Sequence, residues 1–277
     1  MDMMEKIIKV PEYAAIKEKQ NAAWGSGNYA LIGSTLQLSG EELAQRMDLK
    51  PGSEVLDVAA GNGNASLAFA RRWCNVTSTD YVDTLLLNGQ ERALAEGLDI
   101  HYMLADAENL MVDYGTYDAV VSTFGVMFAP NQKKAASELL RACKRGGKIG
   151  MANWTPEGFI GQLFKIIGKH VAPPLGVKSP ALWGTGNWIG QQFGSVSSEI
   201  VIIEKQFYFR YPSPKFFVDF FRKYYGPVHK AFLTLNKDGQ DALEKDILEL
   251  IKDLNVAKDG SMKVPSDYLE IVITKSK

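Results

Sequence analysis

The sequence lacks the features that mark secreted, zinc-binding and membrane-spanning proteins. Among its 277 residues there are two cysteines, Cys74 and Cys143, which are too few for a disulfide framework or a cysteine-based zinc site. No run of about 18 apolar residues is present, so the sequence predicts no membrane span. The first residues contain no apolar segment typical of a signal peptide. We therefore expect a cytoplasmic protein in a reducing compartment.

An excess of charge of one sign is also lacking. Lys and Arg total 31 and Asp and Glu total 32, which gives a formal net charge of −1. A nearly neutral chain has no overall attraction to nucleic acid, so we expect no nucleic-acid partner and regard RNA methylation as disfavoured.

What is present is an alternation of strand-like and helix-like segments. Five short apolar segments have the character of buried strands: residues 53–58, 76–80, 100–104, 118–123 and 148–153. Helical patterns separate most of them, at residues 64–72, 82–96 and 133–144. This alternation predicts an α/β fold with a doubly wound, mostly parallel sheet that is covered by helices on both faces.

The amino-terminal part shows no strand pattern. Helices are predicted over residues 11–24 and 39–48, with Ser39 as the cap of the second helix. We interpret residues 1–49 as a helical lid on an α/β core of residues 50–154.

The carboxy-terminal part, residues 155–277, departs from the alternation. Residues 199–211 and 267–274 have strand patterns, and a helical insertion of residues 214–256 lies between them. Two late strands of this kind predict an antiparallel edge on the same sheet, with the intervening helices forming a cap.

Small residues follow the first predicted strand, which contains Asp57. The turn after it holds Ala59, Gly61 and Gly63. Small side chains let a backbone approach a ligand closely, and the start of the next helix presents unpaired N–H groups. A dinucleotide-binding oxidoreductase would carry a third glycine three positions after Gly63, where Ser66 stands.

Carboxylates end the next two strands. Asp80 ends the second strand, 19 residues after Gly61, and Asp106 follows the third. The first spacing suits a carboxylate that accepts both hydroxyls of a ribose. Open α/β sheets bind ligands at the carboxyl ends of their strands, where both acids are expected. The alternative interpretation is that each acid only caps a helix.

Together, Asp57, Ala59, Gly61 and Gly63 resemble the acid-x-Gly-x-Gly-x-Gly signature of class I S-adenosylmethionine-dependent methyltransferases, with Ala59 in the first glycine position. The segments DAVVSTFGVMFAP and ELLRACKRGGKIGMAN resemble the small-molecule branch related to ubiquinone and menaquinone C-methyltransferases. The resemblance implies S-adenosylmethionine as cofactor, S-adenosylhomocysteine as product and a small-molecule methyl acceptor.

The resemblance also implies the residues of the cofactor site. It assigns Asp80 to the ribose, Asp106 to the adenine amino group and the Ala107 N–H to an adenine ring nitrogen. The expected cofactor contacts are Asp57, Ala59, Gly61, Gly63, Asp80, Tyr81, Asp106, Ala107, Ser122, Thr123 and, from the lid, Tyr29.

Catalysis is expected to rest on alignment of the reactants and on exclusion of water, for an in-line displacement. No metal is expected, because metal-dependent catechol-type enzymes need an acid after strand four and an Asp-Asn pair after strand five, and only Asn153 could serve. A general base is needed only if the nucleophile keeps its proton at neutral pH. His170, beside the Ala-Pro-Pro segment of the cap, is the candidate for that role.

Aromatic residues recur at helical spacing in the cap: Phe216, Phe217, Phe220, Phe221, Tyr224 and Tyr225. They indicate either helix packing or the wall of an apolar pocket. We expect an apolar or aromatic acceptor whose nucleophile is oxygen, nitrogen or carbon. The apolar cap is equally open to use as a homodimer interface. A nucleotide-binding oxidoreductase and a non-catalytic cofactor-binding protein are the competing hypotheses.

Overall fold

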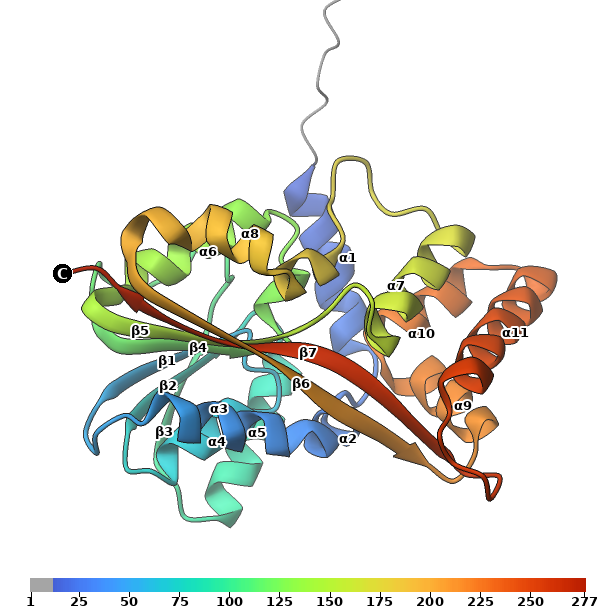
Figure 1. Cartoon of the computed structure of the whole chain (residues 1–277), viewed down its shortest axis with the longest axis horizontal. Helices are drawn as coiled ribbons and strands as arrows, with labels where there is room; N and C mark the ends of the chain where they lie inside the picture. Colours follow the sequence, from blue (N-terminus) through green and yellow to red (C-terminus); the bar gives the residue numbers. More distant parts are fainter. Residues whose placement is uncertain (1–11) are drawn as a thin grey trace, which may run out of the picture.

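The computed structural model describes residues 12–277, and its centre is a seven-stranded sheet of order β3-β2-β1-β4-β5-β7-β6 (Figure 1). The strands are β1 (Glu54–Val58), β2 (Asn75–Asp80), β3 (Ile100–Leu104), β4 (Tyr117–Thr123), β5 (Cys143–Trp154), β6 (Ser197–Tyr211) and β7 (Met262–Lys275). The first five strands are parallel, and β7 runs antiparallel to both β5 and β6. The predicted doubly wound sheet with an antiparallel edge is confirmed.

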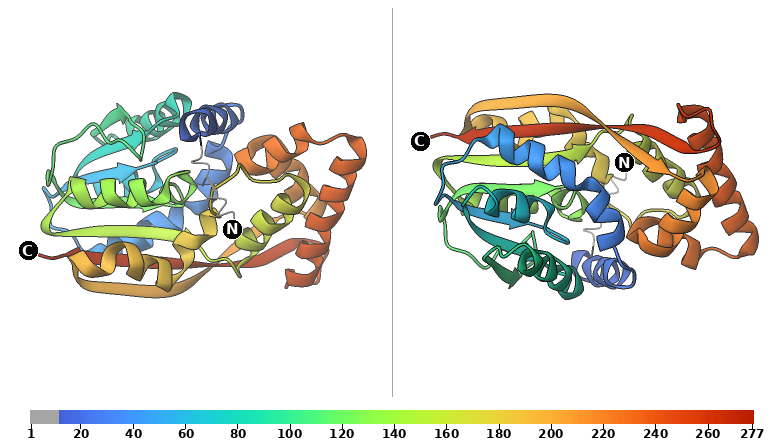
Figure 2. Two further views of the ribbon diagram at one scale, coloured as in Figure 1. Left: turned by 90° about the horizontal axis from the view of Figure 1, so that it is seen from above. Right: turned by 90° about the horizontal axis from the view of Figure 1, so that it is seen from below.

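Helices cover both faces of the sheet (Figures 1 and 2). One face carries α3 (Gln37–Met47), α4 (Asn64–Ala70) and α5 (Asp83–Ala95), and the other carries α6 (Gln132–Ala142) and α8 (Gly186–Phe193). Because helices cover both faces of the central strands, successive residues such as Val55 and Leu56 are both fully buried. This is why these strands are continuously apolar in sequence.

From residue 12 on, the amino-terminal segment is helical, whereas residues 1–11 of the predicted lid lie outside the described residues. It forms α1 (Tyr13–Gly25), α2 (Ala30–Gly33), the 3₁₀ turn η1 (Ser34–Leu36) and α3. The prediction that Ser39 caps a helix is wrong. Because η1 runs directly into α3 at Gln37, Ser39 lies inside the helix and is buried. No free helix start exists there for its hydroxyl to cap.

The strands β6 and β7 extend beyond the rest of the sheet. β5 pairs only with residues 268–274 of β7, whereas β6 pairs with residues 262–275. The protruding ribbon leads into the cap helices α9 (Pro214–Tyr224), α10 (Gly226–Thr234) and α11 (Lys237–Leu254). Figure 1 shows these helices at the end of the sheet opposite the C-terminus. Because β6 pairs with β7 beyond the end of β5, β7 begins at Met262, five residues earlier than predicted.

The cap shares its core with the sheet. One apolar cluster runs from Ile32 in α2 through Phe124 and Trp154 to Phe217 in α9. It also includes α7 (Phe159–His170) and the 3₁₀ turn η3 (Pro180–Gly184). A second, smaller cluster fills the space between α3, α4 and the opposite face of the sheet. Lid, sheet and cap therefore meet around the carboxyl ends of the central strands.

Candidate active site

The carboxyl ends of β1 to β4 border one cavity, with an empty volume of about 830 Å³ including its open mouth. The helix α1 and the turn η2 (Val126–Phe128) complete its walls. The lining residues are Lys17, Gln20, Trp24, Tyr29, Leu36, Ala59, Ala60, Gly61, Asn62, Asn64, Asp80, Tyr81, Leu85, Ala105, Asp106, Ala107, Thr123, Phe124, Gly125, Val126, Phe128, Ala129 and Pro130.

The turn after β1 has three residues in the left-handed region of backbone conformation. The φ angles are +52° at Ala59, +57° at Gly61 and +82° at Gly63. Only glycine adopts this region without strain, which accounts for the glycines and makes Ala59 the strained member. Gly125, after β4, lies so close that a Cβ there would overlap the Ala59 carbonyl oxygen. The two loops therefore form a tightly packed floor.

Asp80 presents a fixed carboxylate to this floor. Its Oδ2 accepts a hydrogen bond from the Gly61 N–H at 2.9 Å, and its Oδ1 accepts one from the Val82 N–H at 2.9 Å. Burial raises the pKa of Asp80 to about 6, although these backbone hydrogen bonds act to lower it. The side chain is thus held in one orientation, and at neutral pH it is mostly a negatively charged hydrogen-bond acceptor.

Asp106 is joined to the amino-terminal helix by an ion pair that sequence reasoning missed. Its Oδ2 lies 2.5 Å from Lys17 Nζ, and its Oδ1 accepts a hydrogen bond from the Glu108 N–H at 2.9 Å. Lys17 Nζ is also 3.1 Å from Glu108 Oε2. Although burial acts to lower the pKa of Lys17, these two acidic partners raise it overall. A lone lysine in a predicted helix gave no signal of this contact.

The helix α1 covers the cavity through polar contacts and one indole ring. Gln20 Nε2 donates to the Phe128 carbonyl at 3.2 Å, and Asn21 Nδ2 donates to the Tyr81 carbonyl at 2.5 Å. Trp24 packs edge-to-face against Tyr29, with ring centroids 5.4 Å apart. No residue of α1 is fully buried. A helix attached in this way is a low-stability element of the fold.

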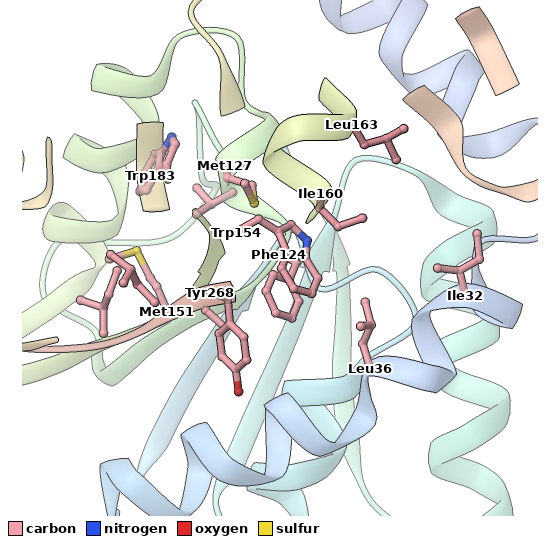
Figure 3. Close-up of a cluster of buried hydrophobic side chains, with 14 of the residues drawn as sticks. Ile32, Leu36, Phe124, Met127, Met151, Trp154, Ile160, Leu163, Trp183 and Tyr268 are labelled. Carbon is pink, nitrogen blue, oxygen red and sulfur yellow. The ribbon is translucent and has the colours of Figure 1, made fainter. Parts of the chain in front are cut away.

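Part of the cavity lining is apolar and includes Leu36, Phe124, Val126 and Phe128. Figure 3 shows Phe124 against Trp154, with Leu36 on the neighbouring helix. Among the described lining residues the only Lys or Arg belongs to α1 and is paired with acids.

Three predicted contact residues support the cavity without lining it. Asp57 Oδ2 accepts hydrogen bonds from Ser66 N–H at 2.8 Å and Ser66 Oγ at 2.6 Å, which fastens α4 to β1. Burial raises the pKa of Asp57 to about 7. Gly63 precedes the first residue of α4. Ser122 Oγ donates to the Val58 carbonyl at 2.7 Å and accepts from the Val126 N–H at 2.9 Å.

The other predicted cofactor residues do meet at the cavity: Tyr29, Ala59, Gly61, Asp80, Tyr81, Asp106, Ala107 and Thr123. The ring of Tyr29 lies over Gly61, where a Cβ would be 3.5 Å from its Cε1. Burial, followed by the charge of Asp80, raises the pKa of Tyr29, so its hydroxyl stays protonated.

The structure does not bring His170 to the cavity. It ends α7, and its Nε2 lies 2.9 Å from Asp246 Oδ2 in α11. The sequence placed His170 near the acceptor because it precedes the Pro-rich segment, but the helix ends in a contact with another cap helix. Its catalytic role stays a prediction.

Within residues 12–277, no helix is long and apolar enough to cross a membrane. In the same part of the chain, no three His, Cys, Asp or Glu side chains gather in a way that could hold a metal ion.

A family profile described as "Methyltransferase domain" matches residues 55–147. An uncharacterized protein of Mycobacterium tuberculosis is 36% identical over 252 residues, covering 87% of this chain and 92% of that protein. A demethylmenaquinone methyltransferase of Clavibacter sepedonicus is 33% identical over 126 residues, covering 45% of this chain and 51% of the enzyme.

Solved structures share the fold at low sequence identity. A Bacillus halodurans protein described as a candidate methyltransferase has a TM-score of 0.60 and 19% identity, covering 85% of this chain and 98% of its own. A phosphoethanolamine N-methyltransferase of Haemonchus contortus, solved with phosphomonomethylethanolamine and S-adenosylhomocysteine, has a TM-score of 0.54 and 19% identity. That match covers 86% of this chain and 52% of the enzyme.

Proposed function

Because the chain belongs to the class I S-adenosylmethionine-dependent methyltransferases, we propose that its cavity holds this cofactor and delivers the methyl group to a small apolar or aromatic acceptor without an anionic group. The observation that carries the proposal is the meeting of Asp80 and Asp106 at one cavity, from the carboxyl ends of two neighbouring strands.

The polar lining residues fit an adenosyl ligand. The carboxylate of Asp80 is oriented by two backbone N–H groups and has lone pairs left for the ribose hydroxyls. Asp106 and Ala107 lie at the end of β3, where the adenine ring would reach. Because residue 61 is glycine, it places no side chain of its own between the backbone and the ligand.

The apolar lining residues fit the acceptor. When bound, the cofactor supplies an activated methyl group on a positively charged sulfur. The chain's own contribution is to orient the acceptor along Phe124, Val126 and Leu36 and to exclude water beneath α1. Alignment of two reactants can lower a barrier by about 7–11 kcal/mol. An anionic acceptor would lack a partner here, because the lining cation Lys17 is already paired.

Thermal unfolding with four ligands tests the proposal. A ligand at 100 times its dissociation constant stabilises the native state by about 2.7 kcal/mol. Each kcal/mol raises the unfolding midpoint of a domain of this size by roughly 2–4 °C. We expect a rise of several degrees with S-adenosylmethionine and S-adenosylhomocysteine and none with NAD or NADP. A rise with the nicotinamide dinucleotides alone would overturn the proposal in favour of an oxidoreductase.

A further inference from the structure

The strand β6 forms one edge of the sheet. Among the strands of residues 12–277 it pairs only with β7, and Figure 2 shows it along the outer margin of the molecule. It is 15 residues long, whereas strands are usually about 5–6 residues long. An edge of this kind presents a row of free N–H and C=O groups with which another chain can pair.

The middle of this edge lacks the usual protection. Proteins shield edge strands with charged side chains, proline, bulges or a covering segment. β6 contains no proline, its register shift lies at its start, and its charged residues flank the apolar run of residues 200–203, Ile-Val-Ile-Ile. Val201 and Ile202 point to opposite faces of the sheet and are 36% and 38% exposed. Both faces of the strand are therefore partly uncovered at its centre.

The helix α8 leaves room beside this centre. A Cβ added at Gly186, the first residue of α8, would lie 3.6 Å from Ile202 Cδ1, and a Cβ at Gly190 would have no neighbour within 4 Å. Because both positions are glycine, neither places a side chain over Ile202. A second chain can therefore approach the edge there.

A second copy of β6 can pair with this edge in a small set of registers. Two identical strands that pair antiparallel are related by a twofold axis perpendicular to the sheet. Such an axis leaves every side chain on its own face. Because neighbouring residues point to opposite faces, the axis must pass beside one residue and not between two.

An axis beside Ile202 gives the register in which opposite charges meet. Ile202 then faces its own copy, Val201 faces Ile203, and Glu199 faces Lys205 twice by symmetry. An axis beside Val201 would instead place Glu199 opposite Ile203. An axis beside Ile203 would place Lys205 opposite Val201. Opposite-charge and β-branched cross-strand pairs are favourable, so the first register is preferred.

Lys205 also has partners in its own chain. Its Nζ lies 2.9 Å from Glu42 Oε2 and 3.2 Å from Glu270 Oε2, and the side chain is 21% exposed. The additional contact with Glu199 of a second copy therefore selects the register. The affinity comes from the backbone hydrogen bonds of the two edges and from the contacts of their apolar centres.

We infer that the chain forms a homodimer in which β6 pairs antiparallel with β6 of a second copy, centred on Ile202, so that the two sheets become one. The inference does not depend on the proposed function. It places the contact between copies at the sheet edge and not at the apolar cap.

Cysteine cross-linking of the full chain tests the register. In Ile202→Cys the two thiols would face each other across the axis, where opposite Cβ atoms are about 4.5–5.5 Å apart, so mild oxidation should give a covalent dimer. Val201→Cys is the matched control, because Val201 is nearly as exposed but would face Ile203 of the copy. We expect it to cross-link about tenfold less. The native cysteines are buried.

Analytical ultracentrifugation measures the association itself. We expect the wild type to sediment as two chains. Ile202→Lys brings two like charges together on the axis, so its dimer should dissociate at least about 100-fold more readily. Ile202→Val keeps a β-branched side chain and should stay dimeric. Circular dichroism shows whether each variant is folded.

Three results would overturn the inference. These are a wild type that sediments as one chain at every concentration, a folded Ile202→Lys that is as dimeric as the wild type, and cross-linking of Val201→Cys in place of Ile202→Cys. If Ile202→Lys does not fold, the cross-linking result decides. None of these results bears on the binding of S-adenosylhomocysteine, so the proposed function is tested separately.

Discussion

The polar and the apolar lining residues of the cavity are held by different means. Asp80 and Asp106 are each fixed by backbone N–H groups of their own or neighbouring loops. Phe124 and Phe128 are fixed by packing against rings from distant parts of the chain. The first arrangement is local and short in sequence, and the second depends on lid, sheet and cap together.

The methyltransferase profile covers both groups only in part. It spans residues 55–147, which include Asp80, Asp106 and Phe124. Lys17, Tyr29 and Leu36 come from the lid, and Trp154, which supports Phe124, follows the matched segment. Residues outside the matched segment therefore complete the cavity, and a shared fold does not by itself fix the acceptor.

The largest effect is expected at Asp80. Asp80→Ala removes the carboxylate that we propose accepts the ribose hydroxyls, and we expect affinity for S-adenosylhomocysteine to fall more than tenfold, about 1.4 kcal/mol or more. Asp99→Ala, at an exposed acid before β3, is the control and should leave affinity unchanged. Calorimetry measures both. If Asp80→Ala kept its affinity, Asp80 would not bind the ribose, and the backbone-fixed acids would not be the basis of cofactor binding.

A pH titration should give the next largest effect. The pKa of Asp80 is raised to about 6. The ionised carboxylate is the form that can accept hydrogen bonds from both ribose hydroxyls in addition to those from the backbone. We therefore expect affinity for S-adenosylhomocysteine to be about tenfold lower at pH 5 than at pH 8. Asp80→Asn should bind weakly at both pH values. An equally steep dependence in that variant would assign the titration to another group.

The same shift has a consequence for stability without ligand. A carboxyl group whose pKa is about 6 in the folded protein and near 4 when unfolded holds more protons in the native state between those values. The contribution of Asp80 to the free energy of unfolding therefore falls as pH rises from about 4 to 6. Subtracting the profile of Asp80→Asn from that of the wild type isolates this contribution.

A smaller effect is expected at Lys17. Lys17→Met removes the ammonium that pairs with Asp106 and Glu108 and leaves the buried Glu108 with one fewer partner. We expect S-adenosylhomocysteine to dissociate about 3-fold to 5-fold faster, within the range of a partly exposed ion pair. Lys19→Met, on the exposed side of the same helix, is the control. Equal rates in both variants, measured by stopped flow, would show that the ion pair does not hold α1 over the ligand.

The smallest effect is expected at Ala59. Glycine relieves the left-handed strain at φ +52°, worth about 1–2 kcal/mol, but it adds freedom to the unfolded chain, worth about 0.4–1 kcal/mol. We expect Ala59→Gly to raise the free energy of unfolding by about 1 kcal/mol or less. Ala65→Gly, in the helical interior of α4, should instead lower it by about 1 kcal/mol or more. Equal losses in denaturant titrations of both variants would show that Ala59 is not strained.

The sequence predicted the parts of this structure that have local causes. Strand and helix periods, the glycine turn and the acid at the end of β2 are all readable within about 30 residues, and each was found in place. The contact of Lys17 with Asp106 joins residues 89 positions apart, and no sequence pattern within either segment predicts this contact. The position of Ser39 was missed for a related reason, because the turn before α3 is shaped by packing of the lid on the sheet.

The pairing of β6 with β7 has an evolutionary consequence. Tyr211, the last residue of β6, is the register partner of Met262, the first residue of β7. The intervening residues 212–261 thus leave and re-enter the sheet at neighbouring points, and the loop they form is closed by strand pairing whatever its length. Because loop closure depends only weakly on length, such a segment can be lengthened, shortened or exchanged at little thermodynamic penalty. The helices between β6 and β7 can therefore be exchanged without disturbing the loops after β1 to β4 that line the cavity.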